Sequence, residues 1–342
     1  MRLHLKKEEF MKKHIYIYSP SGAVRDKAAF KRGVARLQAL GHEVEVDQDA
    51  LTSYQRFAGD DETRLAAIHR ASASAADVAL ISRGGYGLTR ILPGVQYKKV
   101  AKAIDKGMMF VGISDFTAFQ SAVLAKTGAI TYAGPALCEG FGVGGKPDPD
   151  GHGAGVALVP DDIMEACFDD LLQEQGEGTG WRQHLERPLV ATDGVAADVL
   201  FKRAPSEFFI NHSLLWGGNL TVLSSLQGTP YFPDIKGGTL FLEDIGEHPY
   251  RIERMLTQLL HSGVLARQKA ILLGQFTDCK LVSHDRGFKL QTVIDWLRQK
   301  VKVPVLTNLP YGHVQTKVIL PVGAKVDLAV DGRDAMLVWG HV

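Results

Sequence analysis

Apolar and polar positions follow two alternating spacings in the first 135 or so residues. Short apolar runs occur in the segments HIYIYSPSG, EVEVD, DVALISRGGYG and MMFVGISD. Between them, apolar residues recur three and four positions apart, as with Phe30, Val34 and Leu37 before Gly41. Strands that alternate with helices predict a doubly wound parallel sheet of Rossmann or flavodoxin-like type. We therefore expect an α/β fold whose N-terminal domain has this sheet.

The ends of the predicted strands carry polar and glycine-rich loops. In a doubly wound sheet, ligands bind beyond the carboxyl ends of the strands, which lie at one edge. Three loops should therefore be neighbours there: Ser19–Gly22, Ser82–Gly87 and Gly112–Asp115.

The second half has a different pattern. A Gly-, Pro- and Asp-rich stretch near residues 140–185 predicts an irregular connection. Beyond it, one strong helical pattern, YRIERMLTQLLHSG, lies among apolar segments separated by turn signals: LTVLSSLQGTP, GTLFLED, KAILLGQFTD, VPVLTNLPYGH and AKVDLAVDG. These features predict a smaller mixed α/β domain rich in sheet. We place the N-terminal domain at 14–165, a linker at 166–185 and the C-terminal domain at 186–342.

Composition narrows the class of protein. With 342 residues the chain is long enough for two domains. Its 39 Lys and Arg balance 38 Asp and Glu, which gives no electrostatic case for binding nucleic acid or an anionic membrane. Three scattered cysteines and the absence of any C-x-x-C pair argue against a disulfide framework or structural zinc. No apolar run is long enough to cross a membrane, so we expect a cytoplasmic protein.

Ser114 is the first candidate for chemistry, because it follows an apolar strand at the point where a helical pattern begins. A serine there can cap the helix by accepting a backbone N–H bond. It can also be a nucleophile displayed on a strand-to-helix turn, which requires a base and usually an acid that orients the base. The pattern alone leaves both readings open.

Among twelve histidines, His313 is the preferred base. It follows a predicted strand in a Pro–Tyr–Gly loop, where the preceding glycine can carry the ring into a cleft. His212 and His284, which we also expect on loops, remain possible. Glu243 ends an apolar strand and is the preferred acid, although acids at this place also serve as helix-start residues.

The segment SRGGYG is too unlike a dinucleotide fingerprint to indicate nucleotide binding. Its adjacent glycines could expose backbone N–H groups for an oxyanion hole, or simply form a turn. Since no metal-binding or Walker motif is present, we expect neither a metal site nor a cofactor.

Seven segments together resemble the LD-carboxypeptidase A family of serine peptidases, over nearly the whole chain from about residue 14. They are SRGGYGLTRILP, VGISDFTAFQ, TYAGP, WGGNLTVLSSLQGTP, LFLEDIGEHPYRIERMLTQL, GQFTDC and LPYGHVQTKVILPVG. The family includes murein tetrapeptide carboxypeptidases and the related microcin C immunity peptidases. The region near 140–185 carries the least similarity.

The resemblance implies a role for each matching residue. Ser114 would be the nucleophile, His313 the general base and acid, and Glu243 the residue that orients the histidine. The oxyanion hole would be formed by the loop N–H at Gly85 and the backbone N–H of Asp115. Residues expected to contact substrate are Arg83, Gly84, Tyr86, Trp216 and Asn219. For Arg83 a salt bridge with a structural acid, and for Trp216 and Asn219 a packed tryptophan and a loop asparagine, are the alternatives.

The implied substrate is a small peptide, the murein tetrapeptide, from which the enzyme would remove D-alanine bound to meso-diaminopimelate during peptidoglycan recycling. A homodimer is common in the family and is expected here. Two alternatives stay open: a microcin C immunity-type peptidase that cleaves a peptidyl-nucleotide, and a non-catalytic protein that binds muropeptides.

Overall fold

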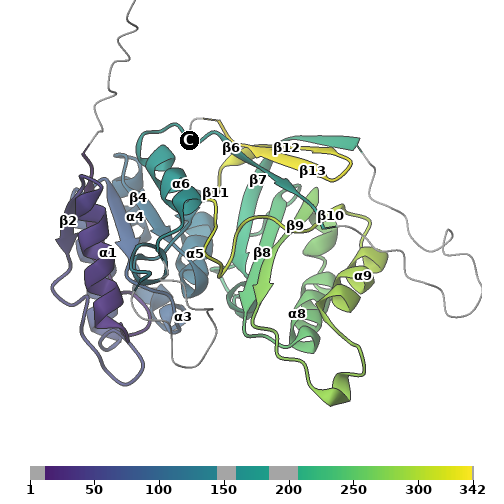
Figure 1. Cartoon of the computed structure of the whole chain (residues 1–342), viewed down its shortest axis with the longest axis horizontal. Coiled ribbons are helices and arrows are strands. Elements are labelled where there is room, and N and C mark those ends of the chain that lie inside the picture. Colours follow the sequence, from purple (N-terminus) through teal and green to yellow (C-terminus); the bar gives the residue numbers. More distant parts are fainter. Residues whose placement is uncertain (1–11, 145–158, 185–206, 341–342) are drawn as a thin grey trace, which may run out of the picture.

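The computed structural model describes residues 12–144, 159–184 and 207–340, which form two lobes, each built around one sheet (Figure 1). The first sheet has the order β11-β5-β4-β3-β1-β2. Its strands are β1 (His14–Tyr18), β2 (Glu43–Val46), β3 (Val78–Ile81), β4 (Met109–Gly112), β5 (Thr131–Ala133) and β11 (Leu320–Val322). All neighbours pair in parallel except β11 and β5, which are antiparallel. The predicted doubly wound sheet is confirmed.

Helices enclose this sheet: α1 (Lys27–Ala39), α2 (Asp61–Ala73), α3 (Leu88–Ile91), α4 (Tyr97–Ile104), α5 (Thr117–Thr127) and α6 (Asp162–Leu172). Side chains alternate between the two faces of a strand. Ile15 and Ile17 accordingly belong to the core cluster with α1 and α6, whereas Tyr16 and Tyr18 belong to the cluster with α2, α4 and α5. Burial on both faces explains why these strands are nearly all apolar.

The second sheet has the order β10-β9-β8-β7-β12-β13-β6. Its strands are β6 (Gly178–Arg182), β7 (Glu207–Asn219), β8 (Thr239–Ile245), β9 (Ala270–Thr277), β10 (Val305–Leu306), β12 (Lys325–Asp331) and β13 (Asp334–Val338), and the helices of this lobe are α7 (Leu220–Ser225), α8 (Pro249–His261) and α9 (Leu290–Lys300). Strands β7 to β10 are parallel, and the other three are antiparallel. This arrangement confirms a mixed α/β second lobe.

The structure adds details that the pattern did not give. The LTVLSS segment, grouped with the sheet-forming segments, is helix α7, because Asn219 ends β7 and caps the helix by accepting the N–H of Val222. Strand β6 lies inside the predicted linker yet is the edge of the second sheet, and β11 belongs to the first sheet although it comes late in the chain. The three domain boundaries stay a prediction.

Helix α5 joins the two lobes. Every residue from Thr117 to Leu124 is buried. The same apolar cluster contains Phe119 of α5, Leu223 of α7 and Phe241 of β8. A continuous core of this kind holds the loops of the first sheet in a fixed position against the strand ends of the second, because an apolar interface resists separation in water.

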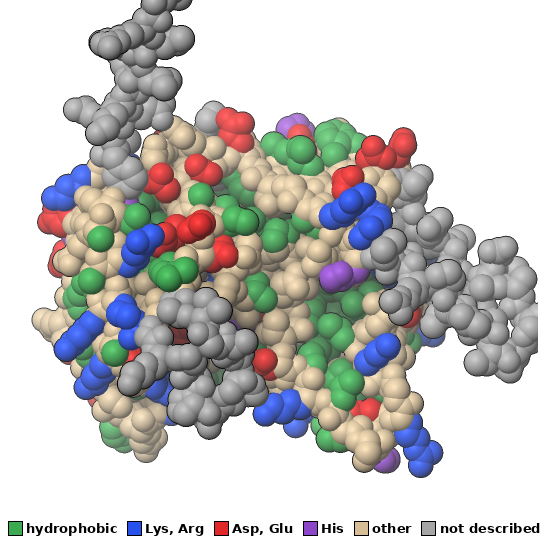
Figure 2. Space-filling model, in the orientation of Figure 1, with side chains coloured by type: hydrophobic (Ala, Val, Ile, Leu, Met, Phe, Trp, Pro, Cys, Tyr) green, Lys and Arg blue, Asp and Glu red, His purple; other side chains and the backbone are tan. Residues whose placement is uncertain are grey.

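The surface agrees with the balanced composition. On the face shown in Figure 2, acidic and basic side chains are interspersed over both lobes. Within the described residues, no helix is long and apolar enough to cross a membrane.

Candidate active site

Ser114 stands on a sharp turn between β4 and α5. Its φ angle is +67°, in the left-handed region that a non-glycine residue occupies at a cost. The turn Ser114–Phe116 has no side-chain capping bond, and the residue before it, Ile113, is in extended conformation. The helix-cap reading of Ser114 is therefore wrong. The strained turn leaves the hydroxyl half-exposed at the carboxyl end of the strand, as a nucleophile requires.

The glycine-rich loop after β3 packs directly on Ser114. A Cβ atom at Gly84 would lie 2.7 Å from the Cβ of Ser114 and 3.0 Å from its Oγ, so only glycine allows this approach. The N–H of Gly22, in the loop after β1, donates to the carbonyl oxygen of Gly84 at 3.2 Å. The prediction that these three loops are neighbours is confirmed. Strands β1 and β3 flank the point where the strand order reverses, the usual ligand position in this fold.

Asp115 ties the three loops together with its side chain. Its Oδ2 accepts the hydroxyl of Ser21 at 2.7 Å and the backbone N–H of Leu88 at 3.0 Å. Burial raises the pKa of Asp115, and these hydrogen bonds oppose that rise. The carboxyl group is thus built into the support of the turn, while its backbone N–H remains the predicted oxyanion donor.

In the second lobe, Glu243 and Asp244 lie near the carboxyl end of strand β8, and both are buried. The pairing of β8 with β9 shifts register between Leu242 and Asp244, which marks a bulge at Glu243. Adjacent residues of a regular strand point to opposite faces, and a bulge can re-aim one of them. The two acids have different partners. Asp244 accepts the N–H and the hydroxyl of Thr221 at the start of α7, whereas Glu243 faces His313.

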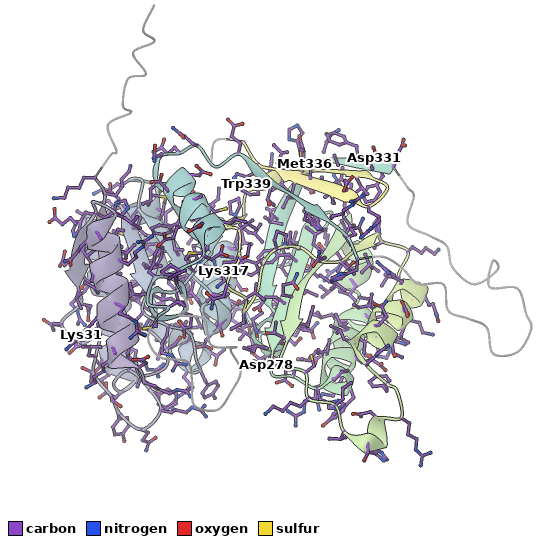
Figure 3. All side chains as sticks on the ribbon, viewed as in Figure 1. Lys31, Asp278, Lys317, Asp331, Met336 and Trp339 are labelled. Atoms are coloured by element: carbon purple, nitrogen blue, oxygen red, sulfur yellow. The ribbon has the colours of Figure 1, made fainter. Side chains whose placement is uncertain are left out.

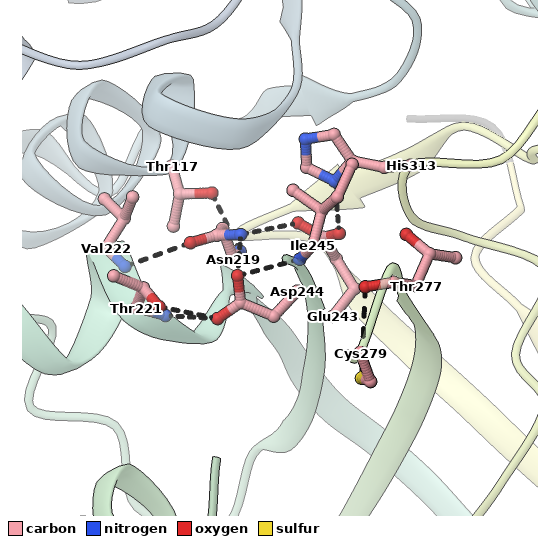
Figure 4. Close-up of polar contacts among 10 residues, drawn as sticks. All are labelled: Thr117, Asn219, Thr221, Val222, Glu243, Asp244, Ile245, Thr277, Cys279 and His313. Atoms are coloured by element: carbon pink, nitrogen blue, oxygen red, sulfur yellow. Dashed lines mark hydrogen bonds and ion pairs between the residues drawn. The ribbon is translucent and has the colours of Figure 1, made fainter. Parts of the chain in front are cut away.

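His313 and Glu243 form the central pair of the site. The Nδ1 atom of His313 lies 2.8 Å from Oε2 of Glu243, whose side chain is fully buried (Figure 4). A carboxylate at Nδ1 favours the tautomer with its proton there, which leaves Nε2 to accept a proton from elsewhere. Burial lowers the pKa of His313, but the hydrogen bond and charge of Glu243 and the charge of Asp244 outweigh it and raise the pKa above its ordinary value.

Asn219 connects this pair to the turn that carries Ser114. Its side-chain Nδ2 donates to Oε1 of Glu243 at 3.2 Å and to Oδ1 of Asp244 at 3.0 Å. Its backbone N–H donates to Oγ1 of Thr117 at 3.0 Å, three residues after Ser114 (Figure 4). A Cβ at Gly218 would lie 2.5 Å from the same Oγ1, so the glycine lets β7 approach α5. The connection runs from the first lobe to the second entirely through hydrogen bonds and short chain segments.

The structure corrects two of the expected substrate contacts. Trp216 is 1% exposed, donates its Nε1–H to Gln268 at 3.0 Å and packs edge-on against Phe232. It is a core residue, so the expectation that it lines the cleft is wrong. Asn219 uses both side-chain N–H groups and its Oδ1 within the protein, which makes it a positioning residue and not a substrate contact.

The remaining predicted residues differ in accessibility. Tyr86 is 49% exposed, with its ring near that of Phe57. Arg83 is largely buried, donates from Nη1 to the carbonyl of Ala23 at 3.1 Å, and has its Nε 3.6 Å from Oε1 of Glu139. The salt-bridge alternative for Arg83 is therefore the arrangement observed.

The other candidate histidines lie elsewhere. His212 lies within strand β7, 3.8 Å from Asp327 and not on a loop, and His284 lies in the turn Ser283–Asp285. In the part of the chain that the structure describes, no group of three His, Cys, Asp or Glu side chains could hold a metal ion.

The two-lobed α/β fold has a serine on a strained turn in one lobe and a hydrogen-bonded histidine–glutamate pair in the other, a combination typical of hydrolases. Two family models match the chain: the LD-carboxypeptidase N-terminal domain over residues 15–134 and the LD-carboxypeptidase C-terminal domain over residues 212–328. The chain belongs to the LD-carboxypeptidase family, as its motifs indicated.

Solved and curated relatives agree with this placement. The crystal structure of muramoyltetrapeptide carboxypeptidase from Oxalobacter formigenes is 35% identical, with a TM-score of 0.77, and the match covers 96% of this chain and 98% of that one. A probable murein peptide carboxypeptidase of Bacillus subtilis is 30% identical over 305 residues, 89% of this chain and 85% of its own length. The microcin C7 self-immunity protein MccF of Escherichia coli is 27% identical over 264 residues, 73% of this chain and 70% of its own.

Proposed function

We propose that this protein is a serine LD-carboxypeptidase that hydrolyses the bond between meso-diaminopimelate and the terminal D-alanine of murein tetrapeptide. The observation that carries the proposal is the pair of His313 and Glu243, 2.8 Å apart, joined through Asn219 to the strained turn of Ser114. The names of the relatives that act on murein peptides support the choice of substrate.

In the proposed mechanism, Nε2 of His313 accepts the proton of the Ser114 hydroxyl as its oxygen attacks the scissile carbonyl. Glu243 holds the ring and stabilises the imidazolium that forms. The backbone N–H groups of Gly85 and Asp115 stabilise the oxyanion. His313 then donates its proton to the leaving nitrogen of D-alanine, and water releases the tripeptide from Ser114 by the reverse sequence of proton transfers.

The direct test is to incubate the full chain with L-Ala-γ-D-Glu-meso-diaminopimelyl-D-Ala and to quantify D-alanine and tripeptide. We expect stoichiometric release of both. The same peptide with a terminal L-alanine is the matched control and should be cleaved far more slowly. Absence of turnover would contradict the assignment, and it would also favour the alternative of a non-catalytic muropeptide-binding protein if the peptide still binds.

A peptidyl-nucleotide substrate is the second candidate, supported by the similarity to the microcin self-immunity protein. Such a substrate calls for an aromatic side chain that stacks on the base. Trp216, the tryptophan expected to line the cleft, is buried and unavailable for this. Turnover of a peptidyl-adenylate faster than that of the tetrapeptide would reverse the preference. A cytoplasmic location, a homodimeric state and a role in peptidoglycan recycling belong to the same proposal.

A further inference from the structure

The proposed function leaves one requirement without a residue. A carboxypeptidase must recognise a free carboxylate at the end of its substrate, and a carboxylate that is taken out of water needs a cation or several N–H donors. Arg83, in the glycine-rich loop that packs on Ser114, is one candidate for this role. Its guanidinium, however, already contacts the carbonyl of Ala23 and lies 3.6 Å from Glu139, so it is engaged in holding its own loop.

Lys317 is the second cation of this region, and its surroundings are unusual. The residue is 3% exposed, and its Nζ atom, which keeps a small accessible surface, makes no hydrogen bond or ion pair with any residue that the structure describes. Lysine is almost never buried without a partner, because the ammonium group loses its hydration. Among the described residues, Lys317 is therefore a cation without a direct partner, as expected of a group that binds an anionic ligand.

The acids around Lys317 come from both sides of the site. The charges of Glu139, which follows β5, Glu243 at the end of β8, and Asp161 before α6 act on it, while burial dominates and lowers the pKa of Lys317. Lys317 itself lies between the two lobes (Figure 3). An additional anion beside the ammonium group would oppose the effect of burial and favour the charged form.

Lys317 is close to His313 along the chain and acts on it electrostatically. It lies on the same loop as His313, four residues further on, and its charge lowers the pKa of His313. In the proposed mechanism, His313 protonates the nitrogen of D-alanine. The carboxylate of D-alanine is attached to the carbon bonded to that nitrogen. In the proposed mechanism this carboxylate therefore approaches the His313 ring, on which the charge of Lys317 acts.

We propose that Lys317 binds the terminal carboxylate of the substrate and thereby restricts the enzyme to the last residue of a peptide. This inference rests on the proposed function and goes one step beyond it. It assigns the exopeptidase specificity to one buried ammonium group, while Arg83 keeps a structural role in the glycine-rich loop.

The test compares Lys317→Met with the wild-type enzyme on two substrates: the tetrapeptide acid and the same peptide ending in D-alaninamide. Both release the same tripeptide, so one mass-spectrometric assay measures both. In the wild type we expect kcat/KM to be about 10²-fold higher for the acid, the usual order for a buried charge pair. On the alkaline plateau of the pH profile, where the pKa of His313 does not limit the rate, Lys317→Met should cleave the acid about 10²-fold more slowly and the amide at nearly the wild-type rate, so the preference should approach one.

Thermal unfolding separates this role from a structural one. Methionine keeps the length of the apolar stem and removes a charge whose pKa burial depresses. A base with a depressed pKa costs folding free energy at neutral pH, so Lys317→Met should unfold at the same or a higher temperature. Lys325→Met, at an exposed position at the start of β12, is the control and should alter neither substrate preference nor activity.

Two results would overturn the proposal: a preference for the acid that persists in Lys317→Met, or an equal loss of both substrates together with a lower unfolding temperature. A wild-type enzyme that cleaves neither substrate would instead refute the proposed function, which keeps the two failures distinguishable.

Discussion

The two sides of the site are built by different means. In the first lobe the position of Ser114 is fixed mainly by backbone geometry. Its φ angle is positive, it lies on a sharp turn, and the missing side chain of Gly84 lets the neighbouring loop pack against it. In the second lobe Glu243 and His313 are fixed by a buried set of side-chain hydrogen bonds through Asn219. The comparison predicts that substitutions around Ser114 lower activity when they add bulk. Substitutions around His313 and Glu243 should lower activity when they remove a charge or a hydrogen bond.

Removing the hydroxyl of Ser114, the proposed nucleophile, should have the largest effect on the rate. Ser114→Ala should lower kcat by about 10⁴-fold or more, because the remaining groups cannot form the acyl intermediate. The unfolding temperature should hardly change, since the hydroxyl makes no capping bond. Ser225→Ala, an exposed serine in α7, serves as the control. Release of D-alanine by Ser114→Ala at a rate close to that of the wild type would remove this residue from the mechanism.

Neutralising Glu243 should have the second largest effect on the rate. Glu243→Gln should lower kcat/KM by about 10³-fold, because the imidazolium loses its buried counter-charge. Glu243 raises the pKa of His313 against the opposing effect of burial, so without the charge that pKa falls. The acidic limb of the kcat/KM profile should therefore move to lower pH.

The pH profile of Asp244→Asn is the comparison for that experiment. Asp244 also raises the pKa of His313, but by its charge alone and without a hydrogen bond to the ring. The shift should be in the same direction and smaller. An acidic limb that is unchanged in Glu243→Gln would show that His313 is not the group that titrates.

A methyl group at Gly84 tests whether the close packing of the glycine-rich loop on Ser114 matters for activity. Gly84→Ala places a Cβ within 3.0 Å of both Cβ and Oγ of Ser114, so the turn or the loop must move. A displacement near 1 Å at a reacting group can cost about 10²-fold in rate. We expect a loss of that size in kcat. Gly180→Ala in β6, where an added Cβ would meet nothing nearer than 3.8 Å, should retain full activity.

The hydrogen bond between the lobes should have the smallest effect of the four. Thr117→Val keeps the shape of the side chain but leaves the buried N–H of Asn219 without its acceptor. An unsatisfied buried donor costs about 1–3 kcal/mol. We expect a clear fall in the free energy of unfolding and about tenfold lower kcat, measured by chemical denaturation and steady-state kinetics. Unchanged stability would mean that this contact does not couple the lobes.

The sequence predicted the parts of the molecule that follow from periodicity. Alternating strands and helices indicated the doubly wound sheet. Because the carboxyl ends of parallel strands lie at one edge, the sequence also predicted correctly that three loops are neighbours: Ser19–Gly22, Ser82–Gly87 and Gly112–Asp115. The motifs indicated the family. The hydrogen bond between Glu243 and His313 joins residues 70 positions apart, and no local pattern encodes such a pairing.

What the sequence missed depends on tertiary packing. The LTVLSS segment has strand-like composition, but Asn219 and Asp244 supply its helical start. For Trp216 the sequence left a substrate contact and a packed tryptophan as alternatives, and the indole is packed, with a buried partner in Gln268. Lys317 was overlooked because only the fold shows that it is buried. A lysine directly before the apolar run VILPV was the one available signal.

The central claim is that the hydroxyl of Ser114 attacks the substrate with help from the His313 ring of the other lobe. The most direct measurement uses the tripeptide ester of D-lactate, whose alcohol leaves readily, with acid quenching and peptide mapping by mass spectrometry. We predict that the tripeptidyl group appears on Ser114 within the first turnover, and that His313→Ala slows its formation by at least about 10²-fold. Hydrolysis of the ester at the wild-type rate with Ser114 unmodified, or acylation that His313→Ala leaves unchanged, would contradict the account.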